Sequence, residues 1–229
     1  LEWLALAAQG QFLEAAAISC TTRNMLEICS RACPQDRLCE GACILNCRAE
    51  PVAIGAVERF INEYAFYHGA VELTRAPANG RRVAVIGSGP GGMAAADELA
   101  QLGYAVTVFE SQQIPGGLLV NGIPAFKLEK SVVERRIQLL EKNGVEFRRG
   151  VHVGRDVSLA ELRRDFDAVF LGIGAQQAKA LDVPGAGLAG VLPSLPFLIQ
   201  KNVGVSPEDF PPVDVAGARL DVEREQASG

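Results

Sequence analysis

One stretch of the sequence restricts the possible folds more than any other. Arg82–Gly87 has the composition of a short buried strand, and it runs directly into the glycine-rich residues 87–92 and then into a helix-forming stretch. In such a strand–turn–helix unit, Gly87 permits the tight turn, Gly89 lets the backbone approach a pyrophosphate, and Gly92 lets the helix pack closely on the strand. The unit therefore predicts a dinucleotide site, with the phosphates facing the free N–H groups at the start of the helix.

The next strand supports this interpretation and narrows the choice of ligand. Residues 105–109 form an apolar run that ends in Glu110, whose carboxylate can accept hydrogen bonds from both hydroxyls of an adenosine ribose. The same carboxylate would repel a 2′-phosphate, and Ser111 after it carries no positive charge. We therefore expect FAD or NAD rather than NADP. A purely structural glycine turn is the alternative, and the full succession of strand, turn, helix, strand and acid disfavours it.

Strands and helices continue to alternate after this unit. The hydrophobic pattern predicts helices at 129–143 and from the capping residue Ser158 to near Phe166, and strands at 145–149 and 168–174. Such alternation predicts an α/β fold with a Rossmann-like, doubly wound parallel sheet. In such a sheet the ligand lies at the carboxyl ends of the strands.

Two further glycine-rich segments are less specific. Residues 114–124 could lie against a flat ligand, or they could be a plain connecting loop. The GxGxxG spacing recurs at 185–190, but no convincing apolar strand precedes it, and Pro193 and Pro196 argue against a regular helix directly after it. We therefore predict a surface loop at this second match rather than a phosphate site.

All six cysteines lie between Cys20 and Cys47. Five of them follow the spacing CxxxCPxxxxCxxxCxxxC, in which one cysteine is followed by proline, as in bacterial ferredoxins. Disulfides suit small secreted frameworks, and zinc sites usually bring CxxC knuckles or paired histidines, whereas this chain has only His68 and His152. Iron–sulfur ligation is therefore favoured over both, and over buried inert cysteines. The candidate ligands are Cys29, Cys33, Cys39, Cys43 and Cys47.

The overall composition excludes several other classes of protein. With 48% hydrophobic and 21% charged residues, the chain is typical of a globular protein, so intrinsic disorder is disfavoured. Its net charge of −5 provides no basic field for nucleic acid or an anionic membrane surface. The longest uncharged run, 183–200, contains three prolines and predicts no membrane helix. No secretory leader is evident, which favours a cytoplasmic location, and the start at Leu1 suggests a processed or partial product.

The chain divides into two parts of different composition. After Pro51, apolar residues at helical spacing predict a helix that ends near Gly69. Residues 75–80 contain proline, asparagine and glycine, as a linker would. We therefore predict a cysteine-rich helical domain over residues 1–76 and a Rossmann-like domain over residues 80–212, followed by residues 213–229.

Four sequence blocks together point to a known family. They are CPQDRLCEGAC at 33–43, PVAIGAVERF at 51–60, VAVIGSGPGG at 83–92 and GGLLVNGIPAFKL at 116–128. In these blocks the chain resembles the small (beta) subunit of NADPH-dependent glutamate synthase and the related N-terminal FAD and iron–sulfur part of dihydropyrimidine dehydrogenase. In that family FAD lies on the first glycine turn, NAD(P)H docks on a second nucleotide domain, and two [4Fe-4S] clusters carry electrons to a partner active site.

The resemblance implies roles for individual residues. It places FAD against Gly87, Gly89, Pro90, Gly92, Glu110, Gly116, Gly117, Leu118, Gly174 and Ala175, with Gly172 in the same loop as the last two. It implies iron ligands at Cys33, Cys39, Cys43 and Glu58, with Cys29 and Cys47 as further metal candidates. Cys20 is a third cysteine that could compensate for ligands the chain lacks.

The resemblance also implies an electron-transfer component that is not active alone. Flavin would take a hydride from NAD(P)H, and iron–sulfur clusters would pass the electrons to a larger oxidoreductase subunit. The family's upstream cysteine run and complete NAD(P)H domain do not appear here, so we expect the remaining cluster ligands from a partner chain or missing segments. The FAD-binding domain is accordingly expected to be incomplete, with 213–229 as a tail or the truncated start of the NAD(P)H domain.

Two other functions stay open at this point. One is a non-catalytic scaffold subunit that keeps the fold, and the other is a zinc-stapled NAD-binding module. No catalytic side chain, nucleic-acid partner or membrane partner is expected in any of the three cases.

Overall fold

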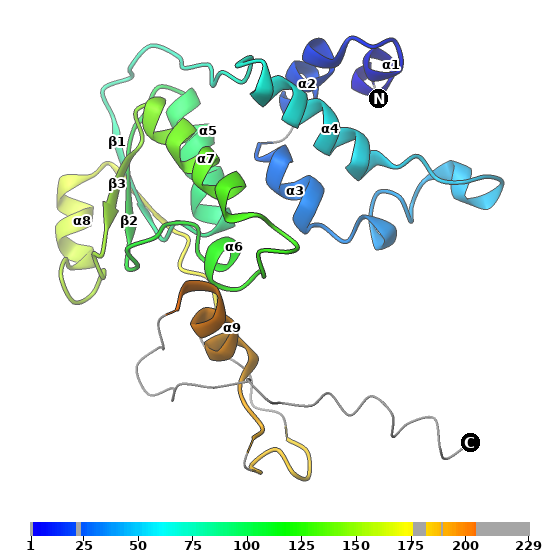
Figure 1. Ribbon diagram of the computed structural model, residues 1–229. Helices are drawn as coiled ribbons and strands as arrows, with labels where there is room; N and C mark the ends of the chain where they lie inside the picture. The colour runs from blue at the N-terminus through cyan, green and yellow to red at the C-terminus, as the bar shows by residue number, and fades with distance from the viewer. Residues whose placement is uncertain (1, 22–23, 176–181, 189, 205–229) are drawn as a thin grey trace.

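The computed structural model describes residues 2–21, 24–175, 182–188 and 190–204. Within them, a four-stranded parallel sheet has the strand order β3-β2-β1-β4 (Figure 1). Its strands are β1 (Arg82–Ile86), β2 (Ala105–Glu110), β3 (Glu146–Arg149) and β4 (Ala168–Leu171). Since the chain leaves β1 toward β2 on one side and later returns to β4 on the other, the strand order reverses at β1. The carboxyl ends of β1 and β4 therefore form the kind of crevice in which doubly wound sheets bind ligands.

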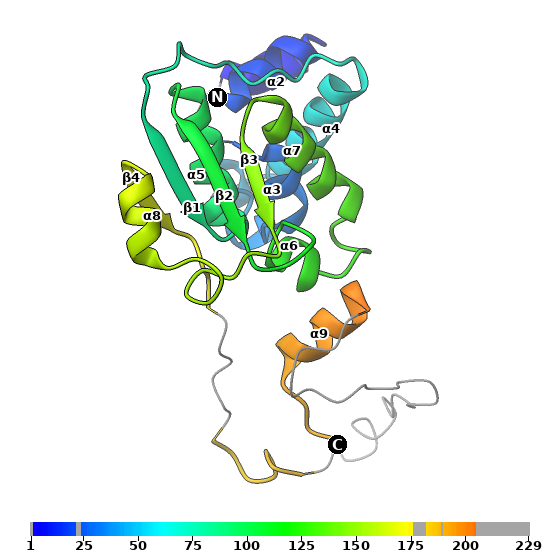
Figure 2. The same ribbon diagram turned by 90° about the vertical axis from the view of Figure 1, so that its left-hand side faces the viewer.

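Helices cover both faces of the sheet at its central strands β1 and β2, whose residues are almost all buried. The helices α5 (Pro90–Gln101) and α7 (Lys130–Lys142) pack on one face, where they share a buried cluster with Val85, Val106 and Val108. On the other face, α8 (Leu159–Asp165) contributes Leu162 to a smaller cluster. Figure 2 shows α8 and α7 on opposite sides of the strands. The predicted α/β fold with a parallel sheet is confirmed.

Local signals account for the ends of these helices. Pro90 occupies the first position of α5, where its missing N–H costs no helical hydrogen bond. Ser158 caps α8, and its side chain and that of Glu161 exchange hydrogen bonds with each other's backbone in a capping box. The single-turn helix α6 (Leu118–Asn121), which lies within the glycine- and proline-rich loop, was not predicted.

The prediction about the segment after the second GxGxxG match is wrong in one respect. Residues 183–188 form turns, as expected, but a regular helix, α9 (Ser194–Val203), follows them. Pro193 precedes this helix as its N-cap and Pro196 lies in its first turn. A backbone N–H has no helical partner at these positions, so the two prolines are compatible with the helix.

The cysteine-rich part is helical. It comprises α1 (Glu2–Ala8), α2 (Phe12–Cys20), α3 (Leu26–Ala32) and α4 (Ile54–Tyr67), with short 3₁₀ turns at Gln35–Arg37 and Ile44–Cys47. Trp3, Ala15, Ala16, Ile61 and Ala65 form its own small core. Figure 1 shows these helices beside α5 and α7, on the side of the sheet away from α8.

Helix α3 belongs to both parts of the molecule. It packs along α4, yet Met25 and Ile28 are buried in the main core with residues of α5 and α7. Two arginines reinforce this junction. Arg136 of α7 pairs with Glu27 and, at 3.4 Å, with Asp97 of α5. Arg31 of α3, whose side chain is also buried, pairs with both Glu63 and Glu129. The helix that carries Cys29 is therefore held rigidly against the sheet domain.

Among the described residues, no helix combines the length and the apolar character needed to cross a membrane.

Candidate dinucleotide site and cysteine region

The glycine turn after β1 is packed so tightly that it excludes side chains. Gly87 has a φ of +94°, and a Cβ on it would lie 2.5 Å from the carbonyl oxygen of Gly172, which follows β4. A Cβ on Gly92 would lie 1.9 Å from the carbonyl oxygen of Gly87. Both neighbours are backbone atoms that no rotamer change can move. Glycine at these two positions lets β1, β4 and α5 meet and leaves main-chain groups lining the crevice at the strand ends.

The start of α6 is packed on this turn. Gly117 has a φ of +52°, and a Cβ on it would lie 2.8 Å from the Cα of Gly89. The N–H of Gly116 donates to the hydroxyl of Ser88 at 2.9 Å. The pair of glycines that the sequence assigned to a loop therefore packs on the glycine turn rather than lying apart from it.

Glu110 ends β2 at the same edge of the sheet. Its carboxylate is buried and accepts hydrogen bonds at both oxygens. One oxygen accepts from the N–H and hydroxyl of Ser88, and the other accepts from the hydroxyl of Ser111 and the N–H of Gln112 at 2.8 Å. Ser88 is thus a residue that sequence analysis missed: it links Glu110 to the glycine turn and to α6. Its place between two glycines was the only signal.

The other predicted cofactor-binding residues lie at this edge too. Pro90 opens α5 beside the glycine turn, and Leu118, half-exposed, opens α6. Gly174 and Ala175 are exposed and follow β4, and the N–H of Gly172 donates to the Ile86 carbonyl at 2.8 Å. The fold therefore gathers the predicted cofactor-binding positions at the carboxyl ends of β1, β2 and β4, while their contacts to a cofactor stay predictions.

The cysteines lie along α3 and the segment that follows it. Cys29 is in α3, and Cys33 lies one turn later at its C-cap. The pKa of the Cys29 thiol is raised to about 11, mainly by burial and also by the nearby Cys33, Glu27 and Glu58. Glu58, on α4, is itself buried. The structure thus places both Cys33 and Glu58 near Cys29.

Cys43 has the opposite environment. Its sulfur accepts hydrogen bonds from the backbone N–H groups of Val52, Leu45 and Asn46, and these lower the pKa of its thiol. Such N–H donors stabilise a thiolate, which is the form that ligates metals, and they also tune the potential of cluster-bound sulfur. The local backbone therefore favours the thiolate form of Cys43.

The predicted ligands are not assembled into one site. Residues 34–50 extend away from α3 as an arm that carries Cys39, Cys43 and Cys47 (Figure 1). In the part of the chain that the structure describes, no group of three histidine, cysteine, aspartate or glutamate side chains could hold a metal ion. Ligation by Cys29, Cys33, Cys39, Cys43, Cys47 and Glu58 stays a prediction.

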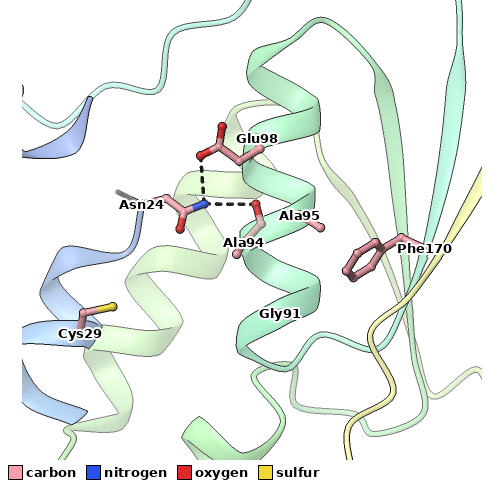
Figure 3. Close-up of a pocket in the computed structure, with 7 residues that line it drawn as sticks. All are labelled: Asn24, Cys29, Gly91, Ala94, Ala95, Glu98 and Phe170. Atoms are coloured by element: carbon pink, nitrogen blue, oxygen red, sulfur yellow. Dashed lines mark hydrogen bonds between the residues drawn. The ribbon is translucent and has the colours of Figure 1, made fainter. Parts of the chain in front are cut away.

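A shallow cleft of about 530 Å³ lies between the helical part and the sheet domain. It runs between α3 and α5 and is lined by Asn24, Cys29, Gly91, Ala94, Ala95, Glu98 and Phe170 (Figure 3). The amide of Asn24 donates to the Ala94 carbonyl at 3.2 Å and to the Glu98 carboxylate at 3.3 Å. The cleft therefore places Cys29 across from the first turns of the helix that begins at the glycine turn.

Two families of known proteins match different parts of the chain. Residues 1–70 match the family described as dihydropyrimidine dehydrogenase domain II, 4Fe-4S cluster. Residues 81–204, more than half of the chain, match the pyridine nucleotide-disulphide oxidoreductase family. The chain belongs to the pyridine nucleotide-disulphide oxidoreductase family. Its N-terminal part is of the 4Fe-4S type, so the predicted family resemblance and the oxidoreductase, flavoprotein-type fold are confirmed.

Individual relatives are similar over nearly the whole chain. The glutamate synthase [NADPH] small chain of Escherichia coli is 44% identical over 95% of this chain and 47% of its own length. That of Azospirillum brasilense is 47% identical over 88% of this chain and 42% of its own length. The solved structure of Mycobacterium tuberculosis FprA in complex with NADPH is 29% identical, with a TM-score of 0.48, over 55% of this chain and 29% of that one. The chain thus spans less than half the length of the curated relatives it matches.

Proposed function

We propose that this pyridine nucleotide-disulphide oxidoreductase family member is an FAD- and iron–sulfur-dependent electron-transfer component, similar to the glutamate synthase small chain. It would relay electrons from NAD(P)H to a larger partner subunit and would not be active alone. One observation carries the proposal. Gly87, Gly92 and Gly117 lie so close to neighbouring backbone that none of them has room for a side chain, and they do so where the strand order reverses.

The residues present fit a dinucleotide. A Cβ at Gly87, Gly92 or Gly117 would collide with backbone, so these three positions require glycine and form a cradle of bare main chain. Such a cradle, opening at the start of the twelve-residue helix α5, offers N–H groups to a pyrophosphate. FAD bound there would supply the chemistry, since a flavin accepts a hydride as an electron pair and can release electrons singly.

The work of this chain is to bind and orient that cofactor. Gly87, Gly89 and Gly92 would hold the pyrophosphate. Glu110 would hold the ribose, and Ser88 and Gln112 fix its carboxylate at the crevice beforehand. Because both carboxylate oxygens already accept hydrogen bonds, a ribose would share or replace the bond from the half-exposed neighbour Ser111. Gly116, Gly117, Leu118, Gly174 and Ala175 would line the rest of the cofactor.

Among the described residues, the cysteines do not by themselves complete an iron–sulfur site. The donor chemistry nevertheless suits ligation, because backbone N–H groups favour the thiolate of Cys43 and because Cys33 and Glu58 both lie near Cys29. We propose that Cys33, Cys39, Cys43 and Glu58 contribute ligands to [4Fe-4S] clusters. A partner chain or further segments of the polypeptide would complete them.

The test is an anaerobic absorption spectrum of the purified chain after incubation with FAD, iron and sulfide, with assays of flavin, iron, sulfide and zinc on the same sample. About one FAD per chain supports the proposal, and iron with matching sulfide extends it to the cluster. Zinc without flavin would point instead to a zinc-stapled NAD-binding module. A folded chain that takes up none of these would contradict the proposal and leave a scaffold subunit.

A further inference from the structure

Helix α6 consists of one turn and cannot be stable alone, because nucleating a turn costs more free energy than its few hydrogen bonds return. Its beginning is held by the glycine turn, through the contact of Gly117 with Gly89 and the hydrogen bond from Gly116 to Ser88. The position of its end therefore decides how closely α6 closes over the crevice.

Two side chains from elsewhere in the sequence hold that end. The ammonium group of Lys130, at the start of α7, donates to the carbonyls of Leu119 and Ile123. The side-chain amide of Asn202, near the end of α9, donates to the carbonyl of Asn121 at 2.9 Å and to that of Gly122 at 3.3 Å. Carbonyls at a helix end have no partner within the helix, so these two side chains satisfy groups that would otherwise depend on water.

Helix α9 is held next to α6 by packing on both α6 and the main hydrophobic core. α9 and α6 pack directly on each other, and both views show them side by side (Figures 1 and 2). Val203, next to Asn202, packs against the main hydrophobic core, and Gly204 ends the helix in the left-handed conformation with a φ of +70°. The side chain of residue 202 is thereby aimed at α6. An amide suits this position because its NH₂ group offers two hydrogens to two carbonyls.

We propose that Asn202 is a positioning residue for the cofactor site: acting with Lys130, it clamps α6 onto the glycine turn and so sets how tightly the site holds FAD. Asn202 does not touch the cofactor in this proposal. It acts through the chain of contacts from α6 to Gly89 and, through Ser88, to Glu110. The inference rests on the proposed function, because it assigns a role at the same site.

The test compares Asn202→Asp with the unmodified chain. Aspartate has almost the same shape as asparagine. It replaces the NH₂ group that donates both hydrogen bonds with a carboxylate oxygen, which repels the Asn121 and Gly122 carbonyls. Asn202→Ala removes the donors without adding charge. Gln9→Glu is the matched control, since it makes the same change from amide to carboxylate at an exposed position at the end of α1.

Three quantities are measured on each purified chain. They are the dissociation constant of FAD from flavin fluorescence, the absorption spectrum of bound flavin, and deuterium uptake of residues 116–123 without cofactor. We expect Asn202→Asp to weaken FAD binding about tenfold, as the loss of two hydrogen bonds would. We also expect altered flavin bands and faster exchange in 116–123, with smaller changes in the same direction for Asn202→Ala and none for Gln9→Glu.

The outcomes separate the inference from the proposed function. If Asn202→Asp and Asn202→Ala bind FAD within twofold of the unmodified chain and with its spectrum, Asn202 is merely structural and the inference is overturned, even if the melting temperature falls. If Asn202→Asp does not fold, the uncharged Asn202→Ala decides in its place. If the unmodified chain binds no FAD, the proposed function itself fails, and faster exchange in 116–123 would then show only a clamp without a cofactor.

Discussion

Arg136 of α7 donates two hydrogen bonds to the carboxylate of Glu27 on α3, at 2.6 and 2.8 Å, and the two side chains are only 3% and 0% exposed. This buried pair joins the helix that carries Cys29 to the domain that carries the glycine turn. Asp97 of α5 lies on the other side of the same guanidinium group. Any electron passed between the two parts would cross a junction whose geometry this charge cluster holds.

Replacing Arg136 with methionine should strongly destabilise the fold. It would leave the carboxylates of Glu27 and Asp97 buried without their cation, and breaking a buried ion pair in this way costs about 3–5 kcal/mol. Urea unfolding measures the difference. Arg164→Met is the control, because its pair with Asp165 is largely exposed to solvent and should contribute little to stability. Equal losses of unfolding free energy in the two variants would show that burial does not increase the contribution of the Arg136 cluster.

Substituting alanine for Gly92 should abolish FAD binding. Its Cβ would lie 1.9 Å from the Gly87 carbonyl oxygen, so the turn or α5 has to shift. Gly91→Ala is a control one residue away, because nothing lies within 4 Å of its Cβ, and alanine is the better helix former. Flavin titration of both chains should show binding lost only in Gly92→Ala. Normal binding by that variant would be incompatible with the cradle described above.

Ser88 should contribute more to the unfolding free energy than Ser111 does. Its buried hydroxyl donates to Glu110 and accepts from the N–H of Gly116. Ser88→Ala would leave that N–H without its acceptor, at a cost of about 1–3 kcal/mol in unfolding free energy. Ser111→Ala removes a partly exposed hydrogen bond to the same carboxylate and should cost less. Thermal and urea unfolding of both variants test this order, and a larger loss for Ser111→Ala would refute it.

The cysteines should react with iodoacetamide in an order set by their pKa values. Only the thiolate attacks, and burial raises the pKa of Cys29 to about 11, so this residue remains a thiol at pH 8 and its reaction rate should keep rising above pH 10. Backbone N–H donors lower the pKa of Cys43, which should therefore react first and reach its plateau at lower pH. Mass spectrometry of each cysteine from pH 7 to 11 measures this. Labelling of Cys29 before Cys43 at pH 8 would contradict the predicted environments.

Local features of the sequence were sufficient to predict the strand, glycine turn and helix at 82–101, the parallel α/β fold and the family. Each of these depends on residues close together in the chain: glycines where a Cβ would collide, apolar runs that both faces of a sheet can bury, and a serine that caps α8. The proposed tail at 213–229 and the end of the predicted domain at residue 212 lie outside the described residues. The cytoplasmic location stays a prediction.

Only the tertiary structure decided which side chains from distant parts of the sequence contact one another. The Glu27–Arg136 pair joins positions 109 residues apart, and Asn202 reaches carbonyls 80 and 81 residues away. Neither leaves a local signal, because a side chain's partner across such a distance depends on how whole helices pack. The same reason applies to the cysteines: their spacing predicts metal ligation, whereas the structure shows the segment 34–50 extending away from α3 (Figure 1). The spacing of cysteines in the sequence indicates which residues could share a metal, and the packing of the helices decides which of them lie close together.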